Sequence, residues 1–237
     1  KYTEKFIEPF VLNAADKITV VYRIIQSYVT KHSSKESQVL HNKVDCNRFF
    51  SAKVIEKLSQ PMILSVGNLI SVKNHKILIK SMKEINAHLL IIGNGELFEE
   101  LNQLIIECGV QNKVTIKKSV PNNQIQDYYK SAKIFALAYN TEVESLPMPV
   151  IEAMAAGLPV VIPFPKEGFS EGLEKTAIFS KNNEEAFTEN IQKLLNNEGL
   201  REKFSILSVN KAKEFDAQKI EKREAEIYLE LLKKVQK

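Results

Sequence analysis

Two glutamates, Glu144 and Glu152, flank the segment Ser-Leu-Pro-Met-Pro-Val-Ile. A carboxylate accepts hydrogen bonds from hydroxyl groups, and a vicinal diol satisfies both of its oxygens. The apolar run around Glu152 predicts the start of a helix, whose first N–H groups, at Met148, Val150 and Ile151, carry a partial positive charge that suits phosphate. The segment therefore predicts a site for a ligand with hydroxyls at both ends and phosphate in the middle.

The same two residues also have a purely structural explanation. The helix dipole favours a glutamate in the first turns of a helix, and a glutamate in the preceding loop is usually solvated. An isolated pair at this spacing is most often no more than that. The elements around the pair decide between the two interpretations.

Short apolar runs alternate with amphipathic stretches from Pro61 onward. The expected strands are 62–66, 88–92, 114–117, 134–138 and 159–164, and the expected helices are 74–85, 96–108, 124–132, 149–156, 183–196 and 200–237. Gly109 and Gly157 follow two of these helices, at the position where a helix commonly ends with a residue in the left-handed conformation. Strands separated by crossover helices predict an α/β protein with a Rossmann-like parallel sheet and helices on both faces. Such sheets bind ligands at the carboxyl ends of their strands, where Glu144 and Glu152 are expected.

Composition excludes several classes of protein. The 237 residues are 44% hydrophobic and 26% charged with a net charge of +4, which suffices for a core and is too weakly basic for a dedicated nucleic-acid binder. Cys46 and Cys108 form no CxxC pair and have no histidine cluster nearby, so neither a disulfide scaffold nor a metal site is expected. No apolar run is long enough to span a membrane, and residues 1–10 are unlike a signal peptide. We expect a cytoplasmic protein, open to peripheral contact with a membrane.

The block from Glu144 to Glu152 resembles the E-x7-E signature of retaining glycosyltransferases of family 4, which have the GT-B fold of two facing Rossmann-like domains. The resemblance implies that Glu144 holds hydroxyls of the donor sugar and that Glu152 holds the ribose of the nucleotide. Pro147 stands where many members have glycine, and proline offers no N–H to a ligand. The chain would then be the C-terminal half of a GT-B fold.

Two further segments resemble the same family in the expected order. The sequence Gly-Asn-Leu at 67–69 with Lys73 is similar to the family's G-R-L…K element, in which Arg and Lys neutralise the donor diphosphate; Asn68 stands in place of the Arg. The sequence Gly-Asn-Gly at 93–95 resembles a strand-to-helix turn, and Phe98 in the third glycine position of a dinucleotide fingerprint weakens a nicotinamide-binding interpretation. The resemblance implies no metal, with Glu144 and Lys73 as catalytic residues and Glu152, Asn68, Gly67, Gly93, Ser119, Ser145, Leu146, Met148 and Val150 as donor-binding residues.

The upstream segments 14–20 and 41–45 resemble the last elements of the family's N-terminal domain and the linker after it. We therefore divide the chain into 1–57, a remnant of the N-terminal acceptor domain with the linker, 58–214, the nucleotide-sugar-binding domain, and 215–237, a C-terminal helix that crosses back. From its residues alone, 1–57 is either an edge extension of the main sheet or the end of another domain. The final helix is expected to expose apolar surface or to dock on 1–57.

The implied function is a glycosyltransferase of polysaccharide biosynthesis that moves a hexose with retention from a nucleoside diphosphate sugar, of UDP type, to a saccharide or lipid-linked acceptor. It would use no cofactor, and its partners would be the donor, the acceptor and the N-terminal domain, not nucleic acid. By itself the chain is expected to bind donor and to transfer sugar poorly or not at all. The alternative is a non-catalytic nucleotide-sugar-binding or interaction module, which Asn68 favours.

Overall fold

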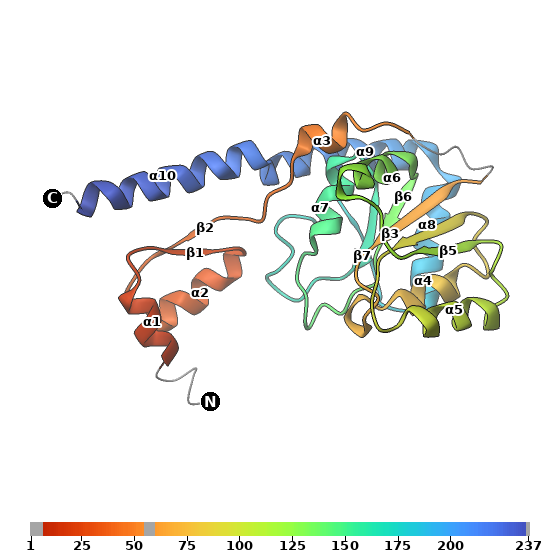
Figure 1. The fold of residues 1–237 in the computed structure, drawn as a ribbon, viewed down its shortest axis with the longest axis horizontal. Coiled ribbons are helices and arrows are strands. Elements are labelled where there is room, and N and C mark those ends of the chain that lie inside the picture. The colour runs from red at the N-terminus through yellow and green to blue at the C-terminus, as the bar shows by residue number, and fades with distance from the viewer. Residues whose placement is uncertain (1–6, 55–59, 236–237) are drawn as a thin grey trace.

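Six parallel strands form the main sheet of the computed structural model, which describes residues 7–54 and 60–235 (Figure 1). The strands are β3 Met62–Val66, β4 His88–Ile92, β5 Val114–Lys117, β6 Ile134–Ala136, β7 Val160–Pro163 and β8 Ile178–Ser180. Their order is β5-β4-β3-β6-β7-β8, and all pairs are parallel, so the predicted Rossmann-like sheet is confirmed. The chain winds outward in opposite directions from β3 and β6, and an open parallel sheet forms its ligand crevice at such a switch point.

Helices cover both faces of the sheet because successive strand residues point to opposite sides. Ile63 of β3 belongs to one core layer and Leu64 to the other. The helices that pack in the layer of Ile63 are α4 His75–Ser81, α5 Phe98–Glu107 and α8 Glu184–Asn196. Those that pack in the layer of Leu64 are α3 Cys46–Phe50, α6 Ile125–Ser131 and α7 Met148–Ala155. The helix α9 Glu198–Ala212 lies against α7 and α8.

The structure differs from the sequence-based expectation at three elements. The strand β8 was not predicted, because the segment 164–177 before it contains no helix, so β8 falls outside the alternation of strands and helices. The helix expected over 74–85 ends at Ser81. The helical stretch expected from 200 is interrupted by the 3-10 turn η4, Lys213–Phe215, and by the extended backbone of Asp216, after which α10, Ala217–Val235, begins.

The N-terminal segment forms a unit of its own. Its elements are α1 Glu8–Ala14, β1 Ile18–Val20, α2 Arg23–His32 and β2 Ser37–Val39. The strands β1 and β2 form a separate two-stranded parallel sheet with a small core of Ile18, Val20 and Val29. An edge extension of the main sheet is therefore wrong for this segment. The expected boundary between residues 57 and 58 lies outside the described residues.

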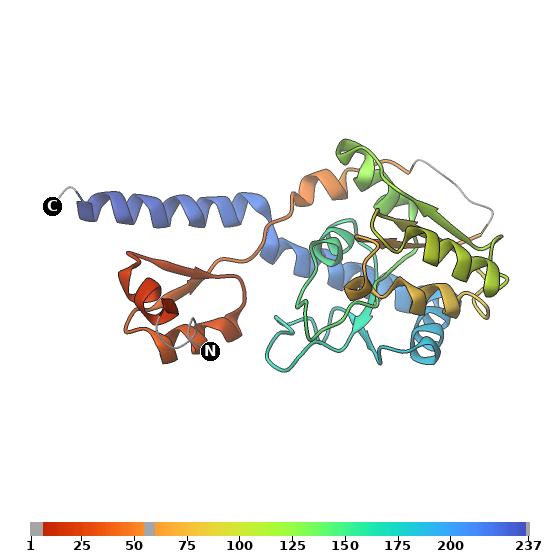
Figure 2. The same ribbon diagram turned by 60° about the horizontal axis from the view of Figure 1, so that its bottom comes forward.

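The chain passes between the N-terminal unit and the main sheet twice, and the two passages touch. The Val44 N–H donates to the Phe215 carbonyl at 2.9 Å, and the Ala217 N–H donates to the Val44 carbonyl at 2.8 Å. From there α10 runs alongside the N-terminal unit (Figures 1 and 2). It contacts that unit through Arg223, which donates to Gln38 at 3.2 Å. The helix also leaves the side chains of Tyr228, Leu229 and Leu232 exposed. It therefore combines the two expected behaviours, contact with residues 1–57 and an exposed apolar surface.

Candidate functional site

Two glycine-containing loops lie together at the carboxyl ends of β3 and β4. The Leu69 N–H donates to the Asn94 carbonyl at 2.9 Å, and the Gly67 N–H donates to the Ile92 carbonyl at 3.0 Å. A Cβ atom on Gly93 would stand 1.9 Å from the Gly67 carbonyl oxygen. Glycine is therefore required at position 93 because the two loops approach so closely that no side chain fits.

The two residues predicted to be catalytic form an ion pair. Lys73 ends the 3-10 turn η2, Ser71–Lys73, which follows the first glycine loop. Its Nζ atom lies 2.6 and 2.7 Å from the two carboxylate oxygens of Glu144. The side chains are 11% and 28% exposed, so water screens this pair less than a surface pair. Since Lys73 follows β3 and Glu144 follows β6, the pair lies at the switch point of the sheet.

The loop that carries Glu144 is fixed along its length. The Asn140 N–H donates to the Val72 carbonyl at 2.8 Å, which ties this loop to η2. The Glu144 N–H donates to the Asn140 carbonyl at 3.0 Å. The Tyr139 hydroxyl donates to the Ser145 carbonyl at 2.9 Å, and burial raises the pKa of Tyr139, so that it stays a neutral donor. Glu144 is thus held on a loop with several anchors.

The second glutamate lies in α7 and contacts a buried tyrosine. The Tyr129 hydroxyl of α6 donates to Glu152 Oε2 at 2.7 Å. Burial raises the pKa of Glu152, while the bond from Tyr129 and the charge of Arg48 act against that rise. One carboxylate oxygen of Glu152 is thereby occupied, and the other is left to accept a hydroxyl from a ligand.

A buried histidine lies next to the first glycine loop. His75 begins α4, and its Nδ1 atom lies 3.4 Å from the Ser65 hydroxyl. Its Nε2 atom has no hydrogen-bond partner in the described part of the chain. Burial lowers the pKa of His75 to about 4, so the ring is neutral at pH 7. His75 therefore adds no positive charge beside Lys73.

The other predicted donor-binding residues differ in what they offer to a ligand. Asn68 and Ser119 are exposed. Met148 begins α7, where an N–H has no acceptor within the helix. The sequence predicts a free N–H at Val150, but this group donates to the Pro147 carbonyl at 3.0 Å, and the Val150 side chain is fully buried. The bond closes the first turn of the helix, so Val150 contributes packing and no donor.

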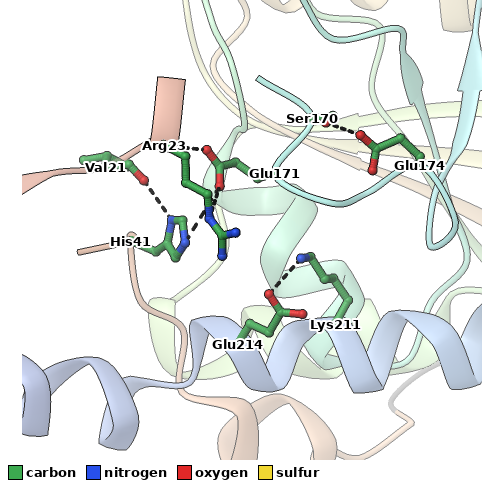
Figure 3. Close-up of polar contacts among 8 residues, drawn as sticks. All are labelled: Val21, Arg23, His41, Ser170, Glu171, Glu174, Lys211 and Glu214. Carbon is green, nitrogen blue, oxygen red and sulfur yellow. Dashed lines mark hydrogen bonds and ion pairs between the residues drawn. The ribbon is translucent and has the colours of Figure 1, made fainter. Parts of the chain in front are cut away.

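Tyr22 of the N-terminal unit reaches this site and was not predicted from the sequence, and its neighbour Arg23 contacts the main unit at Glu171. The Tyr22 hydroxyl lies 3.4 Å from the Leu146 carbonyl oxygen and 3.3 Å from the Leu146 nitrogen. The Arg23 N–H donates to Glu171 of the main unit at 2.7 Å (Figure 3). Both residues directly follow β1. Residues after a parallel strand are the expected place for groups that face a ligand, and this is the signal that would have identified them.

The assembled site has a cation beside one carboxylate and a second carboxylate on the adjacent helix. Lys73 can neutralise a phosphate, and the glutamates can accept hydroxyls. Among the described residues, no three His, Cys, Asp or Glu side chains gather where they could hold a metal ion. Within the same ranges, each helix is too short or too polar to cross a membrane.

Residues 47–208 match a protein family described as Glycosyl transferases group 1. The chain belongs to this family. The matched span contains both glycine loops, the Lys73–Glu144 pair and Glu152.

Curated relatives of this chain include two bacterial proteins. An uncharacterized glycosyltransferase of Haemophilus influenzae is 32% identical over 183 residues, which are 73% of this chain and 50% of that protein. The N-acetylgalactosamine-N,N'-diacetylbacillosaminyl-diphospho-undecaprenol 4-alpha-N-acetylgalactosaminyltransferase of Campylobacter jejuni is 30% identical over 195 residues, 79% of this chain and 52% of that protein. The chain spans about half the length of the curated relatives it matches.

Solved structures show the same fold. A sucrose-phosphate synthase from Thermosynechococcus elongatus matches with a TM-score of 0.83 at 19% identity, over 98% of this chain and 62% of that one. The Anabaena protein Alr3699/HepE, solved in complex with UDP-glucose, matches with a TM-score of 0.80 at 17% identity, over 94% of this chain and 66% of that one. The chain therefore has the Rossmann-like architecture of GT-B proteins.

Proposed function

We propose that this chain is the donor-binding half of a glycosyltransferase that moves a sugar from a UDP-type nucleoside diphosphate sugar to a saccharide or lipid-linked acceptor, with retention at the anomeric carbon. The observation that carries the proposal is the contact between Lys73 and Glu144 at the switch point of the sheet. This contact places the Lys73 ammonium group, which can bind a diphosphate, next to the Glu144 carboxylate, which can accept hydrogen bonds from hydroxyls. In a nucleotide sugar, diphosphate and sugar hydroxyls are neighbours in the same way.

Each residue then has a distinct role in the transfer. Lys73 and the Met148 N–H at the start of α7 stabilise the negative charge that develops on the departing diphosphate. Glu144 accepts hydrogen bonds from sugar hydroxyls and orients the anomeric carbon, and Glu152 accepts from the ribose. Tyr129 fixes the carboxylate of Glu152 for that contact. The attacking hydroxyl belongs to the acceptor.

The names of relatives support the choice of ligands. The Campylobacter jejuni relative is named for an acceptor linked to diphospho-undecaprenol, and a relative in Mycolicibacterium smegmatis is a GDP-mannose-dependent mannosyltransferase of a phosphatidylinositol monomannoside. Both names describe lipid-linked acceptors. Because one name specifies GDP and the Anabaena structure holds UDP-glucose, a test has to include both bases.

Isothermal titration calorimetry with a panel of UDP- and GDP-sugars tests the donor site. We expect one of them to bind and Glu152→Ala to weaken its affinity at least tenfold, since a charged hydrogen bond contributes about 1.5–3 kcal/mol. Glu142→Ala is the matched control, because this glutamate lies in the loop before α7 with its side chain 70% exposed. Absence of binding by every nucleotide sugar at millimolar concentration would refute the donor site. Retention is tested by the anomeric configuration of the transferred sugar in an NMR spectrum of the product.

A non-catalytic binding module is the second candidate, and Asn68 favours it. This residue stands exposed on the first glycine loop, where the family usually has a second positive charge. A module would bind the nucleotide sugar and would neither transfer the sugar nor hydrolyse the donor. Because the chain alone is expected to transfer sugar poorly, the test needs the N-terminal acceptor domain and the acceptor in the preparation. Donor binding without transfer or hydrolysis under those conditions would support this candidate over the enzyme.

A further inference from the structure

Tyr22 belongs to the N-terminal unit but contacts the loop between the two functional glutamates. It directly precedes α2, with extended backbone. Its hydroxyl lies 3.4 Å from the Leu146 carbonyl oxygen and 3.3 Å from the Leu146 nitrogen. A hydroxyl donates one hydrogen bond and accepts others, so it can satisfy both backbone groups of Leu146 at once. Leu146 stands two residues after Glu144, on the segment that leads into α7.

The ring and the protonation state of Tyr22 suit this contact. The ring meets Phe169 edge to face, with centroids 5.6 Å apart and planes at 71°. Burial raises the pKa of Tyr22, and the charges of Glu144 and Glu171 act in the same direction. The hydroxyl therefore keeps its proton at neutral pH and remains able to donate.

A buried glutamate of the main unit anchors the residues next to Tyr22. The Glu171 side chain is 2% exposed, and its backbone has a left-handed φ of 48°, which few residues other than glycine adopt. Its carboxylate accepts the N–H of Arg23, the first residue of α2, at 2.7 Å. It also lies 3.7 Å from Arg23 Nε and 3.8 Å from His41 Nε2 (Figure 3). His41 in turn bonds the Val21 carbonyl at 2.8 Å.

We propose that Tyr22 is a positioning residue for the donor site, which it serves by holding the backbone at Leu146. Glu171 fixes the segment 21–23 to the main unit. Tyr22 of the same segment contacts Leu146, in the loop that carries Glu144. The N-terminal unit thereby adds an anchor to the loop that carries Glu144. This role rests on the proposed function, because Glu144 must contact the sugar of the donor.

The substitution Tyr22→Phe separates this role from a general contribution to stability. It keeps the ring against Phe169 and removes only the hydroxyl. We expect the affinity for UDP-glucose to fall about 2- to 10-fold, as for a lost neutral hydrogen bond, and the affinity for UMP to stay unchanged, because UMP lacks the transferred hexose that Glu144 is proposed to hold. Tyr228→Phe is the control, since Tyr228 is 60% exposed on α10.

Hydrogen–deuterium exchange of the ligand-free protein tests the contact without a ligand. Tyr22→Phe removes the acceptor of the Leu146 N–H, so exchange in residues 140–147 should become faster than in wild type. Exchange in residues 93–97, on the other side of the site, should not change. Glu171→Gln weakens the anchor of segment 21–23 and should accelerate exchange in the same loop.

The outcomes distinguish the two proposals. If wild type binds UDP-glucose and UMP, but Tyr22→Phe weakens both equally or neither, the role of Tyr22 is refuted and the proposed function stands. If wild type binds neither probe nor any sugar of the calorimetric panel, the proposed function is refuted and the donor role of Tyr22 with it. Unchanged exchange in residues 140–147 in both variants would show that Tyr22 does not hold the loop.

Discussion

The Lys73 Nζ atom contacts both carboxylate oxygens of Glu144, at 2.6 and 2.7 Å. Each residue thereby neutralises the charge of the other. A diphosphate and a sugar would replace this one contact with two, one to Lys73 and one to Glu144. Under the proposed function, the pair marks the place at the switch point where the phosphate and the sugar hydroxyls of a donor would meet their two partners.

The substitution Lys73→Gln should weaken the binding of UDP. The neutral side chain cannot neutralise the diphosphate, and Glu144 would stand beside it without its cation. We expect the dissociation constant to rise about 10- to 100-fold by calorimetry, as for the loss of a charged hydrogen bond. Lys76→Gln is the matched control, because Lys76 pairs with Glu100 on the surface. A change of less than twofold in Lys73→Gln would rule out a diphosphate contact.

The substitution Asn68→Arg should strengthen the binding of UDP. Asn68 is exposed on the first glycine loop, so an arginine side chain has room to extend toward the site. A guanidinium binds phosphate with two parallel hydrogen bonds, and we expect affinity to increase about tenfold. Asn123→Arg adds the same charge at another exposed position and controls for net charge. Equal gains in both variants would assign the effect to long-range attraction alone.

Acid should destabilise the protein through His75. Its pKa is lowered to about 4 in the folded chain by burial and is about 6.5 in the unfolded chain. The unfolded state therefore binds the extra proton first, and the contribution to stability is complete above pH 6.5 and is lost as pH falls toward 4. The loss should reach about 2 kcal/mol at pH 5. His75→Gln should remove that part of the slope in urea unfolding at pH 7 and pH 5; identical slopes would contradict the assignment.

The substitution Gly93→Ala should destabilise the fold more than other glycine substitutions. Its Cβ would meet the Gly67 carbonyl oxygen at 1.9 Å, so the two glycine loops have to separate. Overpacking of this kind costs about 3 kcal/mol. Gly109→Ala is the control, since its Cβ meets no atom within 4 Å and only the left-handed φ of 68° opposes it, at a cost of about 1 kcal/mol. Thermal unfolding of the two variants gives the comparison.

Local patterns were sufficient to predict most of the main sheet. The strands β3, β4 and β5 agree with the expected ranges, because β3 and β4 are short, mainly apolar runs and β5 alternates apolar and polar residues. The left-handed conformations of Gly109 and Gly157 are confirmed for the same reason, since a helix end leaves a local signal. The motif residues Lys73 and Glu144 fall at the carboxyl ends of two strands, and the topology then brings them together.

The missed features depend on contacts between distant parts of the chain. The role of Tyr22 is visible only once Leu146 lies against it, and no local pattern reports that contact. The N–H of Val150 is lost to Pro147 because the helix begins with a closed turn, a detail of backbone geometry. The break at Asp216 occurs where the chain meets Val44, inside a stretch whose composition favours one continuous helix.

The bridge between Val44 and Asp216 also constrains the order of folding. Its two residues are separated in sequence by nearly the whole main unit, so the bridge closes a very long loop. During synthesis, the N-terminal unit emerges first and cannot acquire its contacts with Phe215 and Ala217 until the main sheet has been made. The N-terminal unit, with its small core of Ile18, Val20 and Val29, therefore reaches its final position relative to the main sheet only after that step. The two units of this protein are therefore expected to lock together late, as one of the slowest steps on the way to the native state.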